Sequence, residues 1–507
     1  MAAGPETELR FRIAEQNFPK ISATLLAEGG RQGQTARLHA VYYDTPALDL
    51  WRNGFSLRVR EVNGRFFQAI KRGSPSALER EEHEAEVEGP GLDFEHIGAS
   101  PLASLSRSQA LHQLLRPLFE TDIERSSYLF TGSGSLIEVS LDRGLISANG
   151  EAAQVSELEL ELRQGGLAAL FALGRLLASR APLHLSFISK AERGYLLAQG
   201  EFGRAMKSSK PCLQKGIPAS EAFKEICRTC LHDFDLNMLA LRGSDTAEAV
   251  HQGRIALRRL RAALALFKPV ARDMAYEKLG QELKWTARLL GTVRDLDVLE
   301  ANLARAIPPG PSAMRTQARG SGGERRRALK EALDAMESGR GRALLFDLKE
   351  WIEEGQWQRQ PLPKAGEPVE TFARARLKDK WKRLVKRGAH LEELDPAGRH
   401  RIRIAAKRLR YMAEFFAGPA IFGPEQKTLK QIIKSCEKLQ DALGTIRDEQ
   451  AMRNFIQSEA SKPGEAPGSQ TAANRLPAHA RSWRSGHKKE LEKAQRAYSK
   501  LAKMKLF

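Results

Sequence analysis

The chain has 507 residues, of which 42% are hydrophobic and 28% are charged, and its formal net charge is +19. This length exceeds what a single core ordinarily serves, so we expect two or three domains. No apolar run of about 18 residues could span a bilayer, and the N-terminus lacks the basic and apolar regions of a signal peptide; together these favour a cytoplasmic protein.

The positive charge is confined to the second part of the chain. Residues 1–200 contain 21 Lys and Arg against 25 Asp and Glu, a net charge of −4. The remaining residues contain 60 against 37, a net charge of +23. A basic half of this size indicates a polyanionic partner, for which nucleic acid, an acidic membrane and inorganic polyphosphate all qualify.

The first 200 residues have the alternating pattern of an antiparallel, β-rich domain. Helices are predicted at 14–28 and 167–180, and the Asn-Gly and glycine-containing turns between strands indicate hairpins. Strands are predicted at residues 6–12, 38–43, 55–61, 65–71, 79–88, 123–131, 135–142, 156–163 and 183–189.

The strand at 156–163 shows the alternation most clearly. Glu157, Glu159 and Glu161 share one face and leucines occupy the other, because successive side chains of a strand point to opposite faces. Three neighbouring carboxylates repel one another, so this face requires solvent, basic partners or a bound cation. For this strand alone, a solvated sheet face is the alternative.

Other strands separate charged from apolar residues in the same way. Bases in a closed lumen would hold a polyanion, and carboxylates would hold a hard divalent cation, so the set favours a barrel with a charged interior. The charged residues that share a face within their strands are Glu6, Glu8, Arg10 and Arg12; Arg58 and Arg60; Arg80, Glu82, Glu84 and Glu86; and Glu138 and Asp142.

In this order, these segments resemble the CYTH family, which includes triphosphate tunnel metalloenzymes, thiamine triphosphatases and class IV adenylate cyclases. The resemblance covers about residues 1–200 and rests on the opening Glu-x-Glu-x-basic strand, the Tyr-Asp-Thr-Pro turn, the Leu-Arg-Val-Arg strand and the Glu-Leu-Glu-Leu-Glu strand. It implies an eight-stranded antiparallel tunnel that binds a triphosphate together with Mg²⁺ or Mn²⁺.

The resemblance also implies site residues. It assigns catalytic and phosphate-binding roles to Glu6, Glu8, Arg10, Arg58, Arg60, Lys71, Glu82, Arg125, Lys190 and Arg193. It assigns the metal side to Glu138, Asp142, Glu157, Glu159 and Glu161, and spacing does not decide which of these acids touch the metal. Position 10 departs from the family, in which lysine is usual, and arginine does not replace a compact ammonium everywhere. For any single base, a surface ion pair is the alternative.

The second part of the chain is helical in pattern. Residues 201–218 are rich in Gly, Ser and Pro and predict a linker, and breaks at 307–323 and 459–477 predict mobile loops. Residues 461–507 are expected to hold a mobile segment and a basic C-terminal helix. Cys227 and Cys230 have the CxxC spacing without a second pair, so we expect helix cysteines and not zinc ligands.

This helical part repeats itself. Residues 251–261 match residues 400–410, and the Leu-Gly-Thr motif of 290–295 recurs at 443–448. The duplication predicts two similar bundles, at about 219–345 and 366–460, packed about a pseudo-twofold axis. Four positions of each copy share one helical face: His251, Arg254, Arg258 and Arg261, and again His400, Arg403, Lys407 and Arg410.

A solvated basic face is the alternative for these residues. Neighbouring like charges repel by a few tenths of a kcal/mol per pair, so a repeated basic face favours a bound anion. The motifs resemble the CHAD domain, a conserved-histidine helical domain found attached to CYTH domains, over about residues 219–460. The resemblance implies inorganic polyphosphate held along a basic channel between the two halves.

The sequence thus predicts an α+β protein of two domains, with a metal-dependent inorganic triphosphatase in the first and a polyphosphate-binding module in the second. Three alternatives stay open: a non-catalytic polyphosphate-binding or granule-targeting protein, a cyclase-like or thiamine triphosphatase activity, and nucleic-acid binding. Nucleic acid ranks last, because neither an aromatic-interleaved basic strand nor a recognition helix is visible. The expected location is the cytoplasm, with polyphosphate granules as a place of association.

Overall fold

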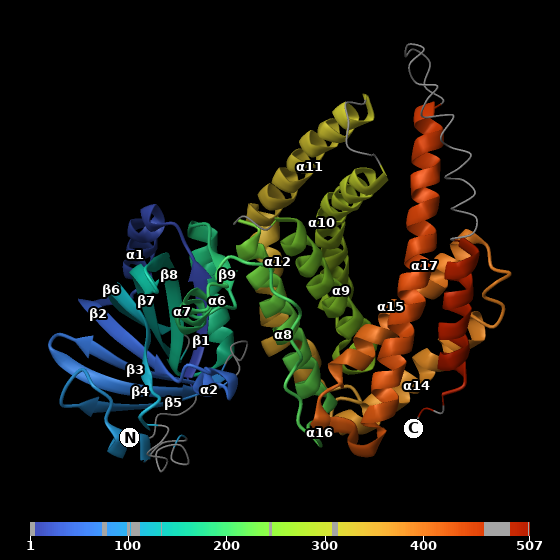
Figure 1. Ribbon diagram of the computed structural model, residues 1–507. Helices are drawn as coiled ribbons and strands as arrows, with labels where there is room; N and C mark the ends of the chain where they lie inside the picture. The colour runs from blue at the N-terminus through green and yellow to red at the C-terminus, as the bar shows by residue number, and fades with distance from the viewer. Residues whose placement is uncertain are drawn as a thin grey trace.

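The computed structural model describes residues 6–73, 79–98, 102, 112–132, 134–242, 246–306, 313–460, 487–504 and 506. Figure 1 shows an N-terminal unit built on a β-sheet that stands beside a helical unit. The predicted two-part α+β organisation is therefore confirmed. Among the described helices, none is both long and apolar enough to cross a membrane.

Nine strands form one antiparallel sheet in the order β5-β4-β3-β2-β6-β7-β8-β1-β9. β5 also pairs with β1, with Glu6 opposite Arg80, so the succession of pairings returns to its first strand. The count differs from the expected eight, because the three-residue β9 adds to β1. The strands are β1 (Glu6–Arg12), β2 (Arg31–Asp44), β3 (Phe55–Val62), β4 (Arg65–Arg72), β5 (Glu79–Val87), β6 (Arg116–Gly132), β7 (Ser135–Ala148), β8 (Glu151–Gln164) and β9 (His184–Ser186).

Short helices accompany the sheet. The predicted helix at 167–180 is confirmed, and the one predicted at 14–28 is present as a 3₁₀ turn followed by an α-helix. The described elements are η1 (Glu15–Asn17), α1 (Phe18–Ala27), α2 (Asp49–Arg52), α3 (Phe94–Gly98), α6 (Leu167–Arg180) and α7 (Lys190–Ala198).

The helical unit begins at residue 219, and residues 487–502 form a further helix. Its elements are α8 (Ala219–Ala240), α9 (Thr246–Ala271), α10 (Ala275–Ala306), α11 (Ala313–Glu337), α12 (Gly339–Glu354), α13 (Gln356–Arg359), α14 (Val369–Arg387), α15 (Pro396–Phe415), α16 (Pro419–Phe422), η2 (Gly423–Glu425) and α17 (Gln426–Ala460).

One of the two predicted breaks is wrong in part. Residues 313–323 are helical, within α11, although this segment contains three glycines and glycine disfavours a helix interior by about 1 kcal/mol relative to alanine. Packing compensates, because α11 lies against α10 and α12 and buries Ala332 and Met336. Residues 307–312 of that break, and residues 461–486 around the second, lie outside the described part of the chain.

The predicted linker is bound to α8 along part of its length. The backbone N–H of Met206 donates to Asn237 Oδ1 at 3.0 Å, and that of Ser209 donates to Asp233 Oδ2 at 3.0 Å. These contacts fix the segment that joins the two units.

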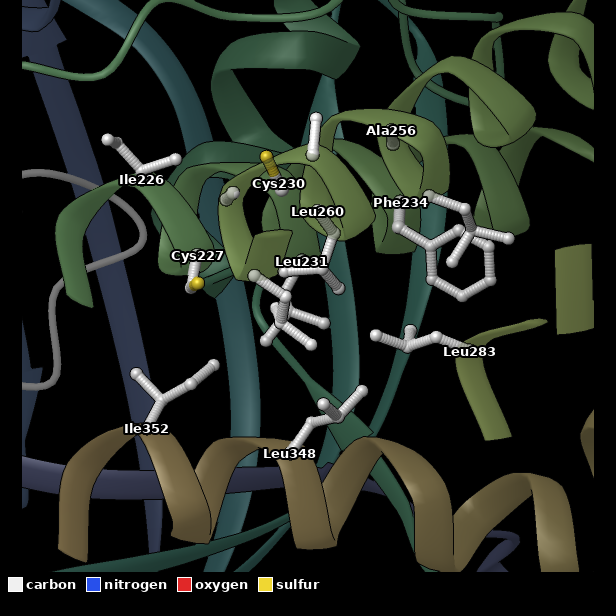
Figure 2. Packing of buried hydrophobic residues seen from close by; sticks show 14 of the residues in the cluster. Ile226, Cys227, Cys230, Leu231, Phe234, Ala256, Leu260, Leu283, Leu348 and Ile352 are labelled. Atoms are coloured by element: carbon white, nitrogen blue, oxygen red, sulfur yellow. The ribbon is translucent and has the colours of Figure 1, made fainter. Parts of the chain in front are cut away.

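One apolar core runs through both units. The outer face of β1 carries Phe11, whose ring stacks on Phe346 of α12 with centroids 5.9 Å apart. Figure 2 shows the helical side of this core, in which Cys227 of α8 points toward α12, the helix that carries Leu348 and Ile352, and Cys230 points away from it. Both cysteines are free and buried within α8, so the prediction of helix cysteines is confirmed.

α7 closes the apolar end of the sheet's inner face. Tyr195 of α7 is fully buried and packs edge-on against Phe119 of β6, with ring centroids 5.2 Å apart. Phe119 shares its strand face with Arg125, because six residues separate them along β6. The inner face is therefore apolar at one end and charged further along.

Gly194 permits this close approach of α7 to the sheet. A Cβ built at Gly194 would lie 2.1 Å from Phe119 Cε2, whereas one built at Gly280, a helical glycine in α10, would meet nothing within 4 Å. We predict that Gly194→Ala lowers the free energy of unfolding by about 1–3 kcal/mol through overpacking. The control Gly280→Ala should raise it by about 0.5–1 kcal/mol. Thermal unfolding of both variants measures the difference, and equal stabilisation by both would contradict the packing described.

Candidate functional site

The charged residues of β7, β8 and β1 lie opposite one another in three neighbouring rows. Directly opposite residues in an antiparallel pair share a face, with Cβ atoms about 4.5–5.5 Å apart. The rows are Glu138, Glu161 and Glu8; Ser140, Glu159 and Arg10; and Asp142, Glu157 and Arg12.

Lys190, the first residue of α7, lies at the centre of these acids. Its Nζ is 2.8 Å from Asp142 Oδ2, 2.8 Å from Glu157 Oε2 and 2.6 Å from Glu159 Oε1. The side chains of Asp142 and Glu157 are 0% and 1% exposed. Buried carboxylates of this kind require paired cations, and one ammonium contacts all three.

Two arginines complete the neutralisation. Arg125 donates from Nε and Nη2 to the two oxygens of Asp142 at 2.7 and 2.6 Å, and Nη2 also lies 2.6 Å from Glu159 Oε2. Arg193, one turn along α7, pairs with Glu157. Each acid therefore shares its charge between two bases.

The pKa shifts follow from this arrangement. Burial alone would raise the pKa of Glu159, but Lys190 and then Arg125 lower it well below its ordinary value. Burial alone would lower the pKa of Lys190, but Asp142, Glu157 and Glu159 outweigh it and raise that pKa. Glu159 and Lys190 are therefore both charged at neutral pH.

A second group of charges comes from β3, β4 and β5. Glu82 lies 3.3 Å from both Arg58 Nη2 and Lys71 Nζ, and Arg60 Nη2 lies 2.8 Å from Glu84 Oε2. The pKa of Arg60 is lowered, most by Arg58, then by burial, and also by Arg125 on β6. Arg60 therefore links the two groups of bases across the inner face.

The remaining predicted acids lie at the more exposed end. Arg163 bridges them, with Nη2 2.7 Å from Glu138 Oε2 and Nη1 2.6 Å from Glu161 Oε1. Arg10 Nη2 lies 3.4 Å from Glu8 Oε1. Within the described ranges, no three His, Cys, Asp or Glu side chains are already arranged to hold a metal ion. Glu6 begins β1, but its side chain lies outside the described residues.

The repeated basic residues of the helical unit also converge. α9 and α15, which carry the two copies, contact each other, and all eight predicted side chains are half-buried. Burial, Arg258, Arg294 and Arg447 lower the pKa of Arg254 to about 10, with only Asp295 acting against them. Arg447 belongs to the second copy, so bases from both halves act on one another.

This lowering of the pKa is largest at Lys407. Burial lowers its pKa to about 7, together with the charges of Arg258 from the first copy and of Arg403 and Arg447 from the second. The pKa values of His251 and His400 are also lowered, by burial and by neighbouring arginines. Arg410 differs from these bases in having carboxylate partners. Its Nη1 lies 3.2 Å from Glu414 Oε1 and 3.8 Å from Glu437 Oε1.

The duplicated Leu-Gly-Thr motif lies against these bases in both copies. A Cβ at Gly291 would lie 2.8 Å from Arg254 Nη1, and one at Gly444 would lie 3.1 Å from Arg403 Nη2. Arg254 and Arg403 occupy equivalent repeat positions, as do the two glycines. Each glycine therefore leaves room for the arginine of its own half.

Comparison with known families gives both units a counterpart. The CYTH domain model matches residues 4–195, and the CHAD domain model matches residues 225–457. The chain joins a CYTH domain to a CHAD domain. Both resemblances seen in the sequence are thereby confirmed.

Individual proteins and solved structures are similar to parts of the chain. An inorganic triphosphatase of Haemophilus influenzae is 29% identical over 198 residues, which cover 39% of this chain and 56% of that protein. An uncharacterized protein of Mycobacterium tuberculosis is 28% identical over 436 residues, which cover 80% of this chain and 82% of that protein. The crystal structure of the CHAD domain from the plant Ricinus communis is 25% identical, covers 59% of this chain and 97% of that chain, and has a TM-score of 0.48.

Several partners in the two domains were missing from the predicted site. Strand parity already placed Glu84 on the face of Glu82 and Glu86, and it would also have found Arg163, which continues the alternation beyond Glu161. Arg294 and Arg447 follow the duplicated Leu-Gly-Thr motif, so the repeat itself marked them. No local pattern pointed to Asp235 of α8 as the partner of Arg12.

The site predicts an acid-sensitive contribution to stability. Because the pKa of Glu159 is lowered on folding, its contribution is complete above pH 4.5 and is lost as the pH falls further through the lowered value. Glu159→Gln should therefore destabilise the protein at pH 7, by about 3 kcal/mol or less, and should flatten the loss of stability between about pH 5 and pH 3. Denaturant unfolding at several pH values measures both. Glu151→Gln, an exposed change on the same strand, should leave the dependence of stability on pH unaltered. If Glu159→Gln also left it unaltered, ionisation of Glu159 would not contribute to stability as described.

Proposed function

We propose that the CYTH domain hydrolyses inorganic triphosphate with the help of a divalent cation. The observation that carries this proposal is the convergence of Lys190, Arg125 and Arg193 on the buried acids Asp142 and Glu157 and the half-buried Glu159, opposite a second basic group around Arg58 and Lys71. Bases from both sides of the inner face could then exchange their carboxylate partners for phosphate oxygens. The named triphosphatase relative supports this choice of substrate.

Hydrolysis at such a site depends on positioning and charge neutralisation, since phosphoryl transfer requires little covalent chemistry from the protein. Lys190 and the arginines would bind the triphosphate and offset its developing charge. A carboxylate with a pKa as low as that of Glu159 is a weak base, so its role is to orient Lys190 and a water molecule rather than to remove a proton.

The row formed by Glu8, Glu161 and Glu138 fits a divalent cation best. Its three carboxylates come from neighbouring strands in register, and oxygen ligands of this type suit Mg²⁺ and Mn²⁺. Arg163 now bridges two of them and is 47% exposed, so it could move into solvent. Held by these carboxylates, the cation would help to neutralise the negative charge of the phosphate groups.

The test is phosphate release from triphosphate by the full chain with Mg²⁺ or Mn²⁺, beside ATP and thiamine triphosphate. We expect metal-dependent turnover that is fastest with inorganic triphosphate. Glu161→Gln should lower kcat/KM by about a hundredfold or more and raise the Mg²⁺ concentration needed, whereas the exposed control Glu151→Gln should change neither. Faster turnover of ATP or thiamine triphosphate would change the proposed substrate. No turnover of any of the three compounds would refute the proposal that this domain is a triphosphatase.

We further propose that the CHAD domain binds inorganic polyphosphate on the converging faces of α9 and α15. Half-buried bases that depress one another's pKa form a site that a polyanion would stabilise. The same charge would attract nucleic acid, but the half-buried position of these bases favours a narrow chain over a duplex.

Polyphosphate binding should depend on this face and not on net charge alone. Arg258→Gln should weaken binding of a short polyphosphate about tenfold or more at fixed salt. Arg401→Gln removes the same charge from an exposed position of α15 and should weaken it less than threefold. Equal losses would indicate diffuse attraction, and equal competition by duplex DNA would favour the nucleic-acid alternative.

Binding should also take up protons. A bound polyanion favours the charged form of Lys407, so it raises that group's pKa from about 7. At pH 7–8 the complex should therefore absorb protons, and affinity should fall as the pH rises above 7. Calorimetry in buffers of different ionisation enthalpy measures this uptake, which Lys407→Gln should remove near pH 8, where the histidines no longer contribute. Unchanged proton uptake in that variant would mean that the polyanion binds away from Lys407.

A further inference from the structure

One helix of the CHAD domain holds two parts of the CYTH site in place. α8 lies at the boundary between the units (Figure 1). His232 Nε2 lies 2.7 Å from Glu192 Oε1, in the first turn of α7, and both side chains are less than 10% exposed. Lys190 and Arg193 belong to the same turns of α7, so α8 helps to fix the helix that supplies the central bases.

Asp235, one turn further along α8, makes the second connection. Its Oδ1 accepts a hydrogen bond from Arg12 Nη2 at 2.9 Å, and its Oδ2 accepts one from the backbone N–H of Phe187 at 2.9 Å. Asp235 is 1% exposed. A single buried carboxylate thus binds β1 and the segment that leads from β9 into α7.

Arg12 has another acid within reach. It is the direct cross-strand partner of Glu157, just as Arg10 is the partner of Glu159 in the next row. Two further nitrogens of Arg12, Nε and Nη1, are buried and have no hydrogen-bond partner among the described residues. Without Asp235, the guanidinium of Arg12 would lie beside Glu157 with donors to spare.

We propose that Asp235 is a positioning residue for the CYTH site, because it holds Arg12 away from Glu157 and so reserves Glu157 for Lys190 and Arg193. This inference rests on the proposed triphosphatase function. It assigns to the CHAD domain a role that is separate from polyanion binding: it completes the charge arrangement of the neighbouring domain.

The decisive test is rescue in the full chain. Asp235→Asn keeps an amide oxygen for the Phe187 N–H but gives Arg12 no anion, so kcat/KM for triphosphate should fall about tenfold or more. Adding Arg12→Gln removes the competing guanidinium, and the double variant should recover to within about threefold of the unchanged chain. A merely structural role for Asp235 predicts the opposite, a double variant no more active than Asp235→Asn.

Asp233→Asn is the matched control. Asp233 is equally buried on α8 but pairs with Arg259 of α9, 3.2 Å away, and with the linker. It should lower stability while leaving kcat/KM within about threefold. Loss of activity equal to that of Asp235→Asn would show general damage to α8 and overturn the proposal.

A crystal structure of Asp235→Asn gives a result that does not depend on activity. We expect Arg12 to hydrogen-bond to Glu157 in that variant, and an Arg12 that stays in its present position would overturn the inference. If the unchanged chain hydrolyses no triphosphate, the proposed function fails, and this structure still decides whether Asp235 controls Arg12.

Discussion

The need to neutralise buried charge governs the N-terminal site. Asp142 and Glu157 are almost completely buried on adjacent strands, and an unpaired carboxylate in that position would carry a large desolvation penalty. Lys190 offsets the penalty by contacting three acids at once, because α7 packs against β6, β7 and β8. The apolar packing of Tyr195 and the absence of a side chain at Gly194 fix that helix. The apolar packing of α7 therefore determines where Lys190 meets the acids.

The two domains treat like charges differently. In the CYTH domain, bases and acids alternate within hydrogen-bonding distance, so a ligand must exchange partners with groups that are already paired. In the CHAD domain, bases from both sequence copies face one another and depress the pKa values of Arg254 and Lys407. The first arrangement suits a short, highly charged substrate that is bound and released, and the second suits a long anion that relieves repulsion along its length.

Much of this could be predicted from residue order. Strand parity placed Glu157, Glu159 and Glu161 on one face, and the duplicated motif marked the bases of α9 and α15. Parity cannot say which base meets which acid, because that depends on register between strands distant in sequence, as for Asp142 and Glu157. The prediction of a loop was also wrong for residues 313–323, since packing of α11 overrides the helix-breaking tendency of its glycines. The pairing of Arg12 with Asp235 spans 223 residues and two domains, so no local pattern could show it.

The most direct test of the account is a crystal structure of the full chain with inorganic triphosphate and Mg²⁺, under conditions that prevent turnover. We predict triphosphate on the inner face of the sheet, with oxygens in hydrogen-bonding distance of Lys190 and Arg58 and with Arg163 displaced from Glu138 and Glu161. Triphosphate found only on the basic faces of α9 and α15, with the carboxylate pairs of Lys190 intact, would contradict it.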